Sequence, residues 1–347
     1  AKSNYIKEVW ERAPRGIIYD SKGQPLVENI SAFNLVVVPA EIPRSRNEQS
    51  KILKLLAQLL GKSEAEIREQ FKNIDRFSFR PVLVLEDLTH EEMILFKSQL
   101  EELEGFRLEE NFKRYYGEGG VFSHVLGYTG RVSPDEIKEN SDYLLTDISG
   151  KNGLELYYEN SLKGKHGVTM METRAEGGKG EAVGSTKAVS GNNLNLFLDK
   201  DLQEKLTEVM RNALSSAGIN KAAAVAIDPK SGGVLAIQSF PLFDSNVFGS
   251  RLSMQSYEEI FENKSQPLFN RAVTGVYPPG STIKPFLGVA ALQEKVVDDK
   301  TIIQDNGSIT VGGQEFKGWT TLGPVDIYRA ISMSSNIFFY TVGGGYG

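Results

Sequence analysis

The sequence predicts an α+β protein of two domains, and three observations support this. The first half alternates short extended runs with helices that begin at recognisable capping residues. Between residues 163 and 193 the composition shifts to Gly, Lys, Glu and Ser with few large apolar side chains, which is typical of a connecting region. An amphipathic segment at 198–214 and an apolar hairpin at 222–240 then indicate a second core. At 347 residues, the chain is long enough for both.

We place the first domain at residues 1–185 and expect it to be an irregular mixture of strands and helices. The run RGIIYDSKGQPLVEN at 15–29 predicts two extended segments around a turn at residues 21–23. Three helix starts are expected where a hydroxyl residue precedes a glutamate by three positions. These pairs are Ser63 with Glu66, Thr89 with Glu92, and Ser133 with Glu136.

The second domain is predicted at residues 186–347, as an antiparallel sheet flanked by helices. The hairpin at 222–240 joins two apolar runs through a loop, 228–233, that is rich in turn-forming residues. Both runs are almost continuously apolar, so we expect a sheet that is covered on both faces. The local sequence of this loop indicates only a turn.

Composition excludes several classes of protein. A net charge of −6 leaves no broad cationic surface for nucleic acid. The absence of cysteine excludes disulfides and thiol chemistry. The longest apolar runs fall far short of the roughly 20 residues that a membrane-spanning helix requires.

The stretch GVYPPGSTIKP at 275–285 places Ser281 and Lys284 three positions apart. On a helix these positions share a face, so the hydroxyl and the ammonium can meet. Two prolines and a glycine precede Ser281 and place it at a helix start, where free backbone N–H groups favour a developing oxyanion. Burial against the apolar segment FLGVAAL, which follows, would lower the pKa of Lys284 and suit it to act as a base. The alternative is a serine cap followed by a solvated lysine, because S-x-x-K is a common pattern.

About fifty residues further on, Ser334, Ser335 and Asn336 interrupt the apolar segment AISMSSNIFFYTV. Three consecutive polar residues in such a segment need hydrogen-bond partners or a wet cleft. Ser334 and Asn336 alternate across Ser335, so at a bend both can face one cavity. They can also simply close a junction between helices. Together, S-x-x-K and S-x-N are two of the three elements of the known signature of penicillin-binding proteins and serine β-lactamases.

Longer stretches also resemble the class B penicillin-binding proteins. GVYPPGSTIKP, SSN and IDPKSGGVLAIQSFPLFDSNVF resemble their transpeptidase domain, and RGIIYDSKGQPL and GKNGLELYYENSLKGKHG resemble their pedestal, or dimerisation, domain. The context NRAVTGVYPPGS is more similar to the elongation type than to the division type. The expected fold is thus a pedestal followed by the N-terminal part of a penicillin-binding, serine β-lactamase-like domain.

The resemblance implies a D,D-transpeptidase that cross-links peptidoglycan stem peptides through a serine acyl-enzyme and is acylated by penicillin. It implies that Ser281 is the nucleophile, that Lys284 is its base, that Ser334 relays a proton to the leaving amine, and that Asn336 binds the substrate amide. No metal or organic cofactor is implied. The implied partners are stem peptides, β-lactams, a polytopic glycan polymerase and a membrane-anchored shape-determining scaffold. The implied location is the outer face of a bacterial cell membrane, with an N-terminal anchor outside this sequence.

The third element of the signature, K-[ST]-G, is not found downstream of Asn336, and we expect it to follow Gly347 in a longer chain. Three other functions remain open. A β-lactam sensor or a non-catalytic cell-wall scaffold would share these motifs. A serine β-lactamase would share Ser281 and Lys284 but has no evident use for a preceding domain of this size.

Overall fold

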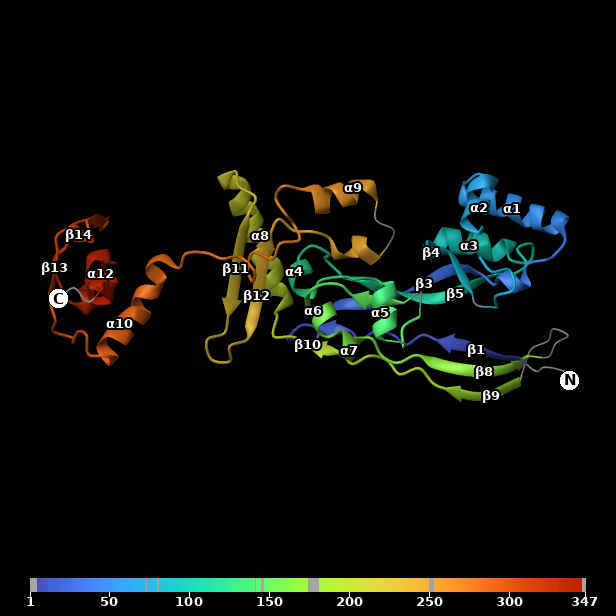
Figure 1. Ribbon diagram of the computed structural model, residues 1–347, viewed down its shortest axis with the longest axis horizontal. Coiled ribbons are helices and arrows are strands. Elements are labelled where there is room, and N and C mark those ends of the chain that lie inside the picture. The colour runs from blue at the N-terminus through green and yellow to red at the C-terminus, as the bar shows by residue number, and fades with distance from the viewer. Residues whose placement is uncertain are drawn as a thin grey trace. The chain divides into compact units, whose positions relative to one another are not determined.

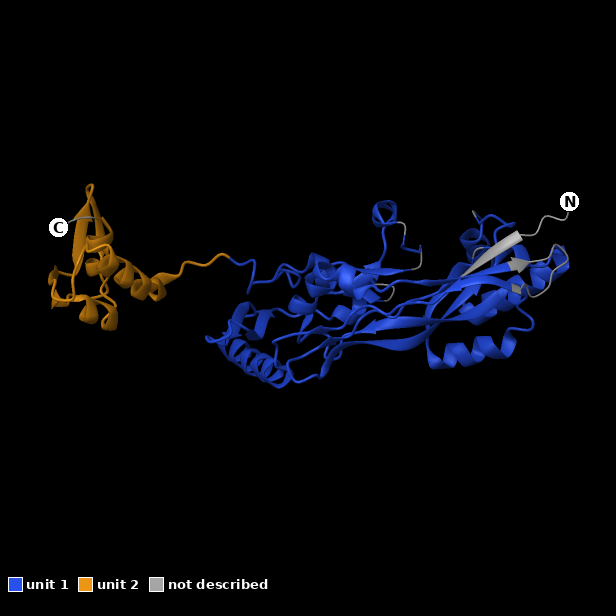
Figure 2. Ribbon diagram, turned by 90° about the horizontal axis from the view of Figure 1, so that it is seen from below, with its two compact units in different colours: residues 1–275 blue, residues 276–347 orange. Residues whose placement is uncertain are grey.

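A computed structural model describes residues 5–344, except residues 73, 80, 141, 145–146, 174–180 and 250–252. The chain forms two compact units, Ala1–Gly275 and Val276–Gly347 (Figure 2). Both units contain helices and strands, which confirms the α+β class. Gly347, the predicted end of the second domain, lies outside the described residues.

A five-stranded sheet forms the framework of the first unit (Figure 1). Its strands are β2 (Ile18–Tyr19), β3 (Pro25–Val37), β4 (Val82–Leu88), β5 (Phe106–Tyr115) and β10 (Leu194–Asn195). The long strand β3 pairs antiparallel with β2, β4 and β5. The predicted turn at 21–23 joins β2 to β3, and Gly23 has a φ of 77° there, which costs a glycine little.

Three helices cover part of this sheet and close its core. They are α1 (Arg46–Leu60), α2 (Glu64–Gln70) and α3 (His90–Gln99). Each contributes a buried apolar side chain to one cluster with the strands, which includes Leu35, Leu56, Ile67, Phe96 and Phe106. This core is independent of the residues proposed for catalysis, all of which lie in the second unit.

All three predicted capping boxes are confirmed. They begin α2, α3 and α5 (Pro134–Glu139). In each, the hydroxyl accepts the backbone N–H of the glutamate while the glutamate carboxylate accepts the N–H of the capping residue. These helix starts were predictable because the contacts span only three residues.

The region from 163 to 193 is not simply a connector, which corrects the prediction from composition. Strands β8 (Gly167–Thr173) and β9 (Glu181–Thr186) pair antiparallel within it, and β8 also pairs with β1 (Tyr5–Glu11). Side chains such as Met170 and Val183 are exposed, 43% and 64% respectively. A ribbon with this much exposed surface needs few apolar residues, so its composition resembles that of a loop.

A buried ion cluster lies between the five-stranded sheet and the short helices α6 (Gly153–Tyr157) and α7 (Glu159–Leu162). Glu155 is fully buried and accepts hydrogen bonds from Arg15 and Arg114, each at 2.7 Å. Removing one partner of such a cluster leaves an uncompensated buried charge, which typically costs about 3–5 kcal/mol. The cluster therefore holds residues more than 100 positions apart in one place.

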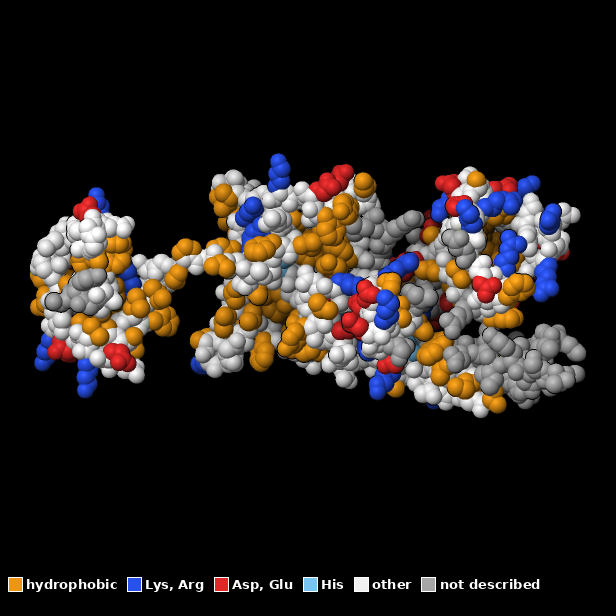
Figure 3. Space-filling model, viewed as in Figure 1, with side chains coloured by type: hydrophobic (Ala, Val, Ile, Leu, Met, Phe, Trp, Pro, Cys, Tyr) orange, Lys and Arg blue, Asp and Glu red, His pale blue; other side chains and the backbone are white. Residues whose placement is uncertain are grey.

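The predicted hairpin is present as β11 (Ala222–Ile227) and β12 (Val234–Phe240), which pair antiparallel. Helix α8 (Lys200–Ala217) packs on β12, where its buried Gln203 donates to the carbonyl of Ile237 and accepts its N–H. The prediction that both faces are covered is wrong for the described residues, because these two strands form their own sheet and Ile227 is 55% exposed. Figure 3 shows apolar side chains at the surface over this hairpin.

Short elements complete the first unit. They are η1 (Pro39–Glu41), α4 (Ser123–Leu126), β6 (Thr129–Arg131), β7 (Ile148–Gly150), η2 (Ser245–Gly249), α9 (Met254–Tyr257) and the π-helical turn η3 (Glu258–Glu262). Within the described ranges, no helix combines the length and apolar character needed to cross a membrane.

The second unit contains three helices and two short two-stranded sheets. The helices are α10 (Lys284–Gln293), α11 (Ile327–Ser332) and α12 (Asn336–Gly344), preceded by the 3-10 turn η4 (Gly280–Ile283). The strands are β13 (Ile303–Asp305), β14 (Ser308–Val311), β15 (Gln314–Lys317) and β16 (Gly323–Val325), paired β13 with β16 and β14 with β15. The core includes Ala291, Val325, Ile327, Ala330 and Phe338.

Candidate active site

Ser281 lies at the start of a helical run, as the sequence predicts. The turn η4 begins at Gly280, whose φ is 58°, and leads directly into α10. A positive φ is readily adopted by glycine, and the two preceding prolines restrict the approach to the turn. Ser281 is exposed, so its hydroxyl is accessible to a substrate.

Lys284 is buried, with 8% of its surface exposed. Its Nζ donates to the Ser334 carbonyl at 2.7 Å, to Ser334 Oγ at 3.0 Å and to Asn336 Oδ1 at 2.6 Å. Burial lowers the pKa of Lys284 below its usual value of 10.5. The lysine therefore loses its proton more readily than a solvated lysine does, and the interpretation of Lys284 as a solvated residue is wrong.

The burial of Lys284 has a different origin from the one predicted. The segment FLGVAAL is largely exposed, with Phe286 at 75% and Val289 at 64%. Lys284 instead lies against the turn at 334–336, and its Nζ is 5.9 Å from the centre of the Phe339 ring. Residues about fifty positions away create the environment that lowers the pKa.

Ser334 lies between the lysine and the exposed serine. Its Oγ is 2.9 Å from Ser281 Oγ and 3.0 Å from Lys284 Nζ. Among the described residues, no hydrogen bond joins Ser281 Oγ directly to Lys284 Nζ, so the predicted contact between the two side chains is made through a third side chain. The structure thus brings together all four residues singled out from the motifs, Ser281, Lys284, Ser334 and Asn336.

The backbone at Ser334 is strained. Its φ is 53°, in the left-handed region that ordinarily favours glycine at the end of a helix. The end of α11 has the corresponding hydrogen bonds, from Ser334 N to Ile331 O at 3.2 Å and from Ser335 N to Ala330 O at 2.8 Å. Holding a serine in this conformation costs about 1 kcal/mol or more. Its hydroxyl enters the site only because the helix ends in this way.

One contributor to this site was missed from the sequence. Asp305, on β13, accepts a hydrogen bond from Ser335 Oγ at 2.6 Å. Its local sequence, Asp-Asn-Gly, is typical of an ordinary turn, so no local signal distinguishes it.

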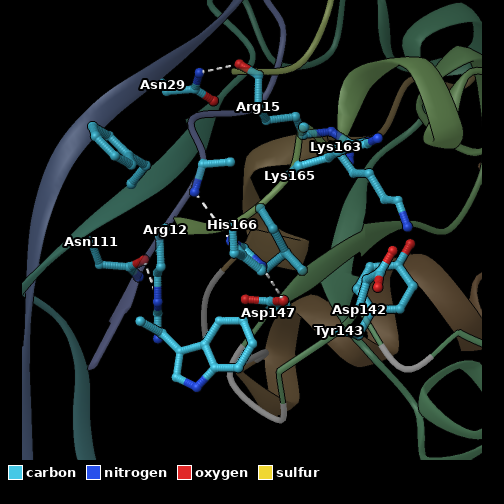
Figure 4. Close-up of a pocket in the computed structure, with 15 residues that line it drawn as sticks. Arg12, Arg15, Asn29, Asn111, Asp142, Tyr143, Asp147, Lys163, Lys165 and His166 are labelled. Atoms are coloured by element: carbon cyan, nitrogen blue, oxygen red, sulfur yellow. Dashed lines mark hydrogen bonds and ion pairs between the residues drawn. The ribbon is translucent and has the colours of Figure 1, made fainter. Parts of the chain in front are cut away.

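A separate cavity of about 290 Å³ lies in the first unit, and none of the four residues lines it. Figure 4 shows His166 in this cavity, next to Asp147 and to the backbone between Arg12 and Arg15. His166 Nδ1 accepts the N–H of Ala13 at 3.1 Å, and Nε2 lies 2.7 Å from Asp147 Oδ2. Because Nδ1 accepts, Nε2 carries the proton and donates to Asp147. This histidine links distant segments, and neither of its two hydrogen bonds is to a nucleophilic side chain.

Within the described residues, no group of three or more His, Cys, Asp or Glu side chains is placed to hold a metal ion.

Two family models match the chain. The penicillin-binding protein dimerisation domain matches residues 11–196, and the penicillin-binding protein transpeptidase domain matches residues 222–344. The chain belongs to the penicillin-binding proteins, which confirms the resemblance indicated by the motifs.

Its relatives include the peptidoglycan D,D-transpeptidase MrdA of Haemophilus influenzae, 33% identical over 99% of this chain and 52% of the relative. MrdA of Salmonella typhimurium is 32% identical over 99% of this chain and 55% of the relative. A solved complex of the penicillin-binding protein PBP2 with MreC from Helicobacter pylori matches with a TM-score of 0.85 and 25% identity, covering 98% of this chain and 63% of that one. The chain spans about half the length of these curated relatives.

Proposed function

We propose that this protein is a peptidoglycan D,D-transpeptidase that acts through a serine acyl-enzyme in cell-wall elongation. The observation that carries the proposal is the continuous path from Ser281 Oγ through Ser334 Oγ to Lys284 Nζ, with steps of 2.9 Å and 3.0 Å. The MrdA relatives support the choice of reaction, since they are named for it.

In the acylation step, Ser281 Oγ attacks the carbonyl carbon of the penultimate D-alanine. The Ser281 proton passes to Ser334 Oγ while the Ser334 proton passes to the neutral amine of Lys284. The bond from the carbonyl carbon to the terminal D-alanine nitrogen then breaks, and that nitrogen takes a proton back along the same path. The backbone N–H of Ser281, in the first turn of η4, is suited to stabilise the oxyanion.

In the second step, the amine of a neighbouring stem peptide attacks the ester carbon and the bond from that carbon to Ser281 Oγ breaks. The proton that the amine loses restores the Ser281 hydroxyl. We propose that the amide of Asn336 binds the peptide backbone of the substrate. A β-lactam presents a similar carbonyl to Ser281 but keeps its leaving nitrogen attached, so the acyl-enzyme persists.

We expect the full-length protein to release D-alanine from a pentapeptide stem and to form a cross-linked product. It should also bind penicillin covalently and hydrolyse it only slowly. The measurement is chromatography of the peptide products alongside the rate of penicillin turnover. Rapid penicillin turnover without cross-linking would identify a β-lactamase. Acylation without cross-linking would favour a sensor. The absence of both activities would favour a non-catalytic scaffold.

We further propose that residues 1–185 are a pedestal and that residues 186–347 are the N-terminal part of the transpeptidase domain. The pedestal would position the catalytic domain at the outer face of the membrane, held by an N-terminal anchor. It would contact a membrane-anchored shape-determining scaffold and a polytopic glycan polymerase. The Helicobacter pylori complex of PBP2 with MreC supports a partner of the first kind.

Substitutions of exposed pedestal residues should therefore impair cell growth while leaving penicillin acylation unchanged. Tyr157, which is 79% exposed, is a suitable position for Tyr157→Ala and neighbouring changes. Growth complementation and acylation are measured on the same variants. If growth and acylation fall together across such variants, the pedestal acts by folding and not by binding.

A further inference from the structure

Asp305 is a buried side chain whose two carboxyl oxygens each accept a hydrogen bond. Its side chain is 1% exposed. Its Oδ2 accepts the Ser335 hydroxyl at 2.6 Å and its Oδ1 accepts the Gly307 N–H at 2.9 Å. No lysine or arginine forms an ion pair with Asp305 among the described residues. A buried polar group requires hydrogen-bond partners, and the Ser335 hydroxyl supplies one of the two that Asp305 has.

Ser335 transmits this contact to the helix that carries Asn336. Ser335 is also 1% exposed, and its Oγ accepts the N–H of Phe338 at 3.1 Å while donating to Asp305. A serine that accepts an N–H three residues later is the N-cap of the following helix. Asp305 therefore fixes the rotamer of the cap, and the cap fixes the first turn of α12.

Ser335 forms hydrogen bonds through both its backbone N–H and its side-chain hydroxyl. Its N–H closes the end of α11, while its hydroxyl starts α12 and contacts β13. Ser334 and Asn336, its two neighbours, are the residues that contact Lys284. The strained φ of Ser334 persists only if the surroundings hold it, and its buried neighbour Ser335 is held by three hydrogen bonds, one through its N–H and two through its hydroxyl.

We propose that Asp305 is a positioning residue for acyl transfer: through Ser335 it holds Ser334 and Asn336 in contact with Lys284. The inference rests on the proposed function, since it concerns the rate of the same serine acylation. Asp305 does not touch Ser281 or Lys284 in the described contacts and is not itself a catalytic residue.

The test measures acylation of the full-length protein by a fluorescent penicillin, recording separately the limiting rate constant, the dissociation constant of the initial complex and the final labelling stoichiometry. Asp305→Ala should lower the limiting rate constant by about 10²-fold, because small displacements of reacting groups have effects of this size. The stoichiometry should remain that of the wild type and the dissociation constant should change little. Asp305→Asn keeps the shape and one acceptor, so its loss should be smaller.

Asp326→Ala is the matched control. Asp326 caps the opposite end of α11 by accepting the Arg329 N–H at 2.7 Å, and it contacts none of the four site residues. This variant should melt at a lower temperature than the wild type yet acylate at the wild-type rate.

An unchanged rate constant in Asp305→Ala, or a loss confined to stoichiometry, would overturn the inference and leave Asp305 as a structural residue. If Asp305→Ala does not fold, Ser335→Ala decides in the same way, since it removes only the hydroxyl. The double variant Asp305→Asn with Ser335→Ala should be no slower than the slower single variant, whereas additive losses count against a shared path. A wild-type protein that fails to label at all would instead contradict the proposed function.

Discussion

Replacing Ser281 by alanine should abolish covalent labelling of the full-length protein by penicillin. The exposed Ser281 hydroxyl is the end of the path that leads through Ser334 to the buried lysine. Alanine supplies no oxygen, so no ester can form. Ser281 is exposed and lies outside the apolar core of the second unit, so the variant should fold like the wild type. The measurement is gel fluorescence after incubation with a fluorescent penicillin, with peptide mass spectrometry to locate the adduct.

Ser332→Ala is the control for this experiment. Ser332 is exposed in the same unit, and its hydroxyl donates only to the Arg329 carbonyl, at 3.2 Å. Its removal should leave labelling unchanged. Labelling that persists in Ser281→Ala, or an adduct that maps to another residue, would remove Ser281 from the mechanism.

Replacing Lys284 by alanine should slow acylation by about 10²- to 10⁴-fold, which is the usual contribution of a general base. In the wild type, burial lowers the lysine pKa, so the neutral amine becomes more abundant as the pH rises through that lowered value. The acylation rate should therefore rise with pH along a limb that lies below the usual lysine pKa of 10.5. That limb should be absent in Lys284→Ala.

The hydrogen bonds explain why protonation matters. The three acceptors around Nζ, which are the carbonyl and hydroxyl of Ser334 and Oδ1 of Asn336, match the three donors of an ammonium. Loss of one proton frees a lone pair that can accept from Ser334. Lys300→Ala, at an exposed lysine in the same unit, is the control and should keep both the rate and the pH limb. If Lys284→Ala acylates at the wild-type rate, Lys284 is not the general base and another group has that role.

Local features of the fold were predictable from the sequence. The capping boxes at Ser63, Thr89 and Ser133 involve partners three residues away, and the 222–240 hairpin is set by an apolar pattern around a turn. The position of Ser281 at a helix start followed from the two prolines and the glycine before it. In each case, one continuous segment of the chain specifies the structure, so the structure can be predicted without knowing the rest of the fold.

Pairing over long distances was not predictable in this way. Strand β8 was mistaken for part of a connector because its partner β1 lies about 160 residues earlier, and its exposed faces need no apolar pattern. The motifs identified Ser281, Lys284, Ser334 and Asn336 as candidates, yet they left open whether Lys284 is buried and what lies beside it.

The sequence by itself determined the family, the two motifs and the residues able to carry the chemistry. Only the tertiary structure decided that Ser334 stands between Ser281 and Lys284, and that Asp305 holds the intervening turn through Ser335. The physical reason is that hydrogen-bond geometry and burial depend on atoms brought together from segments 30 to 53 residues apart. A local pattern specifies which groups are present, while the packing of α10, α11, α12 and β13 determines their distances and the pKa of the lysine.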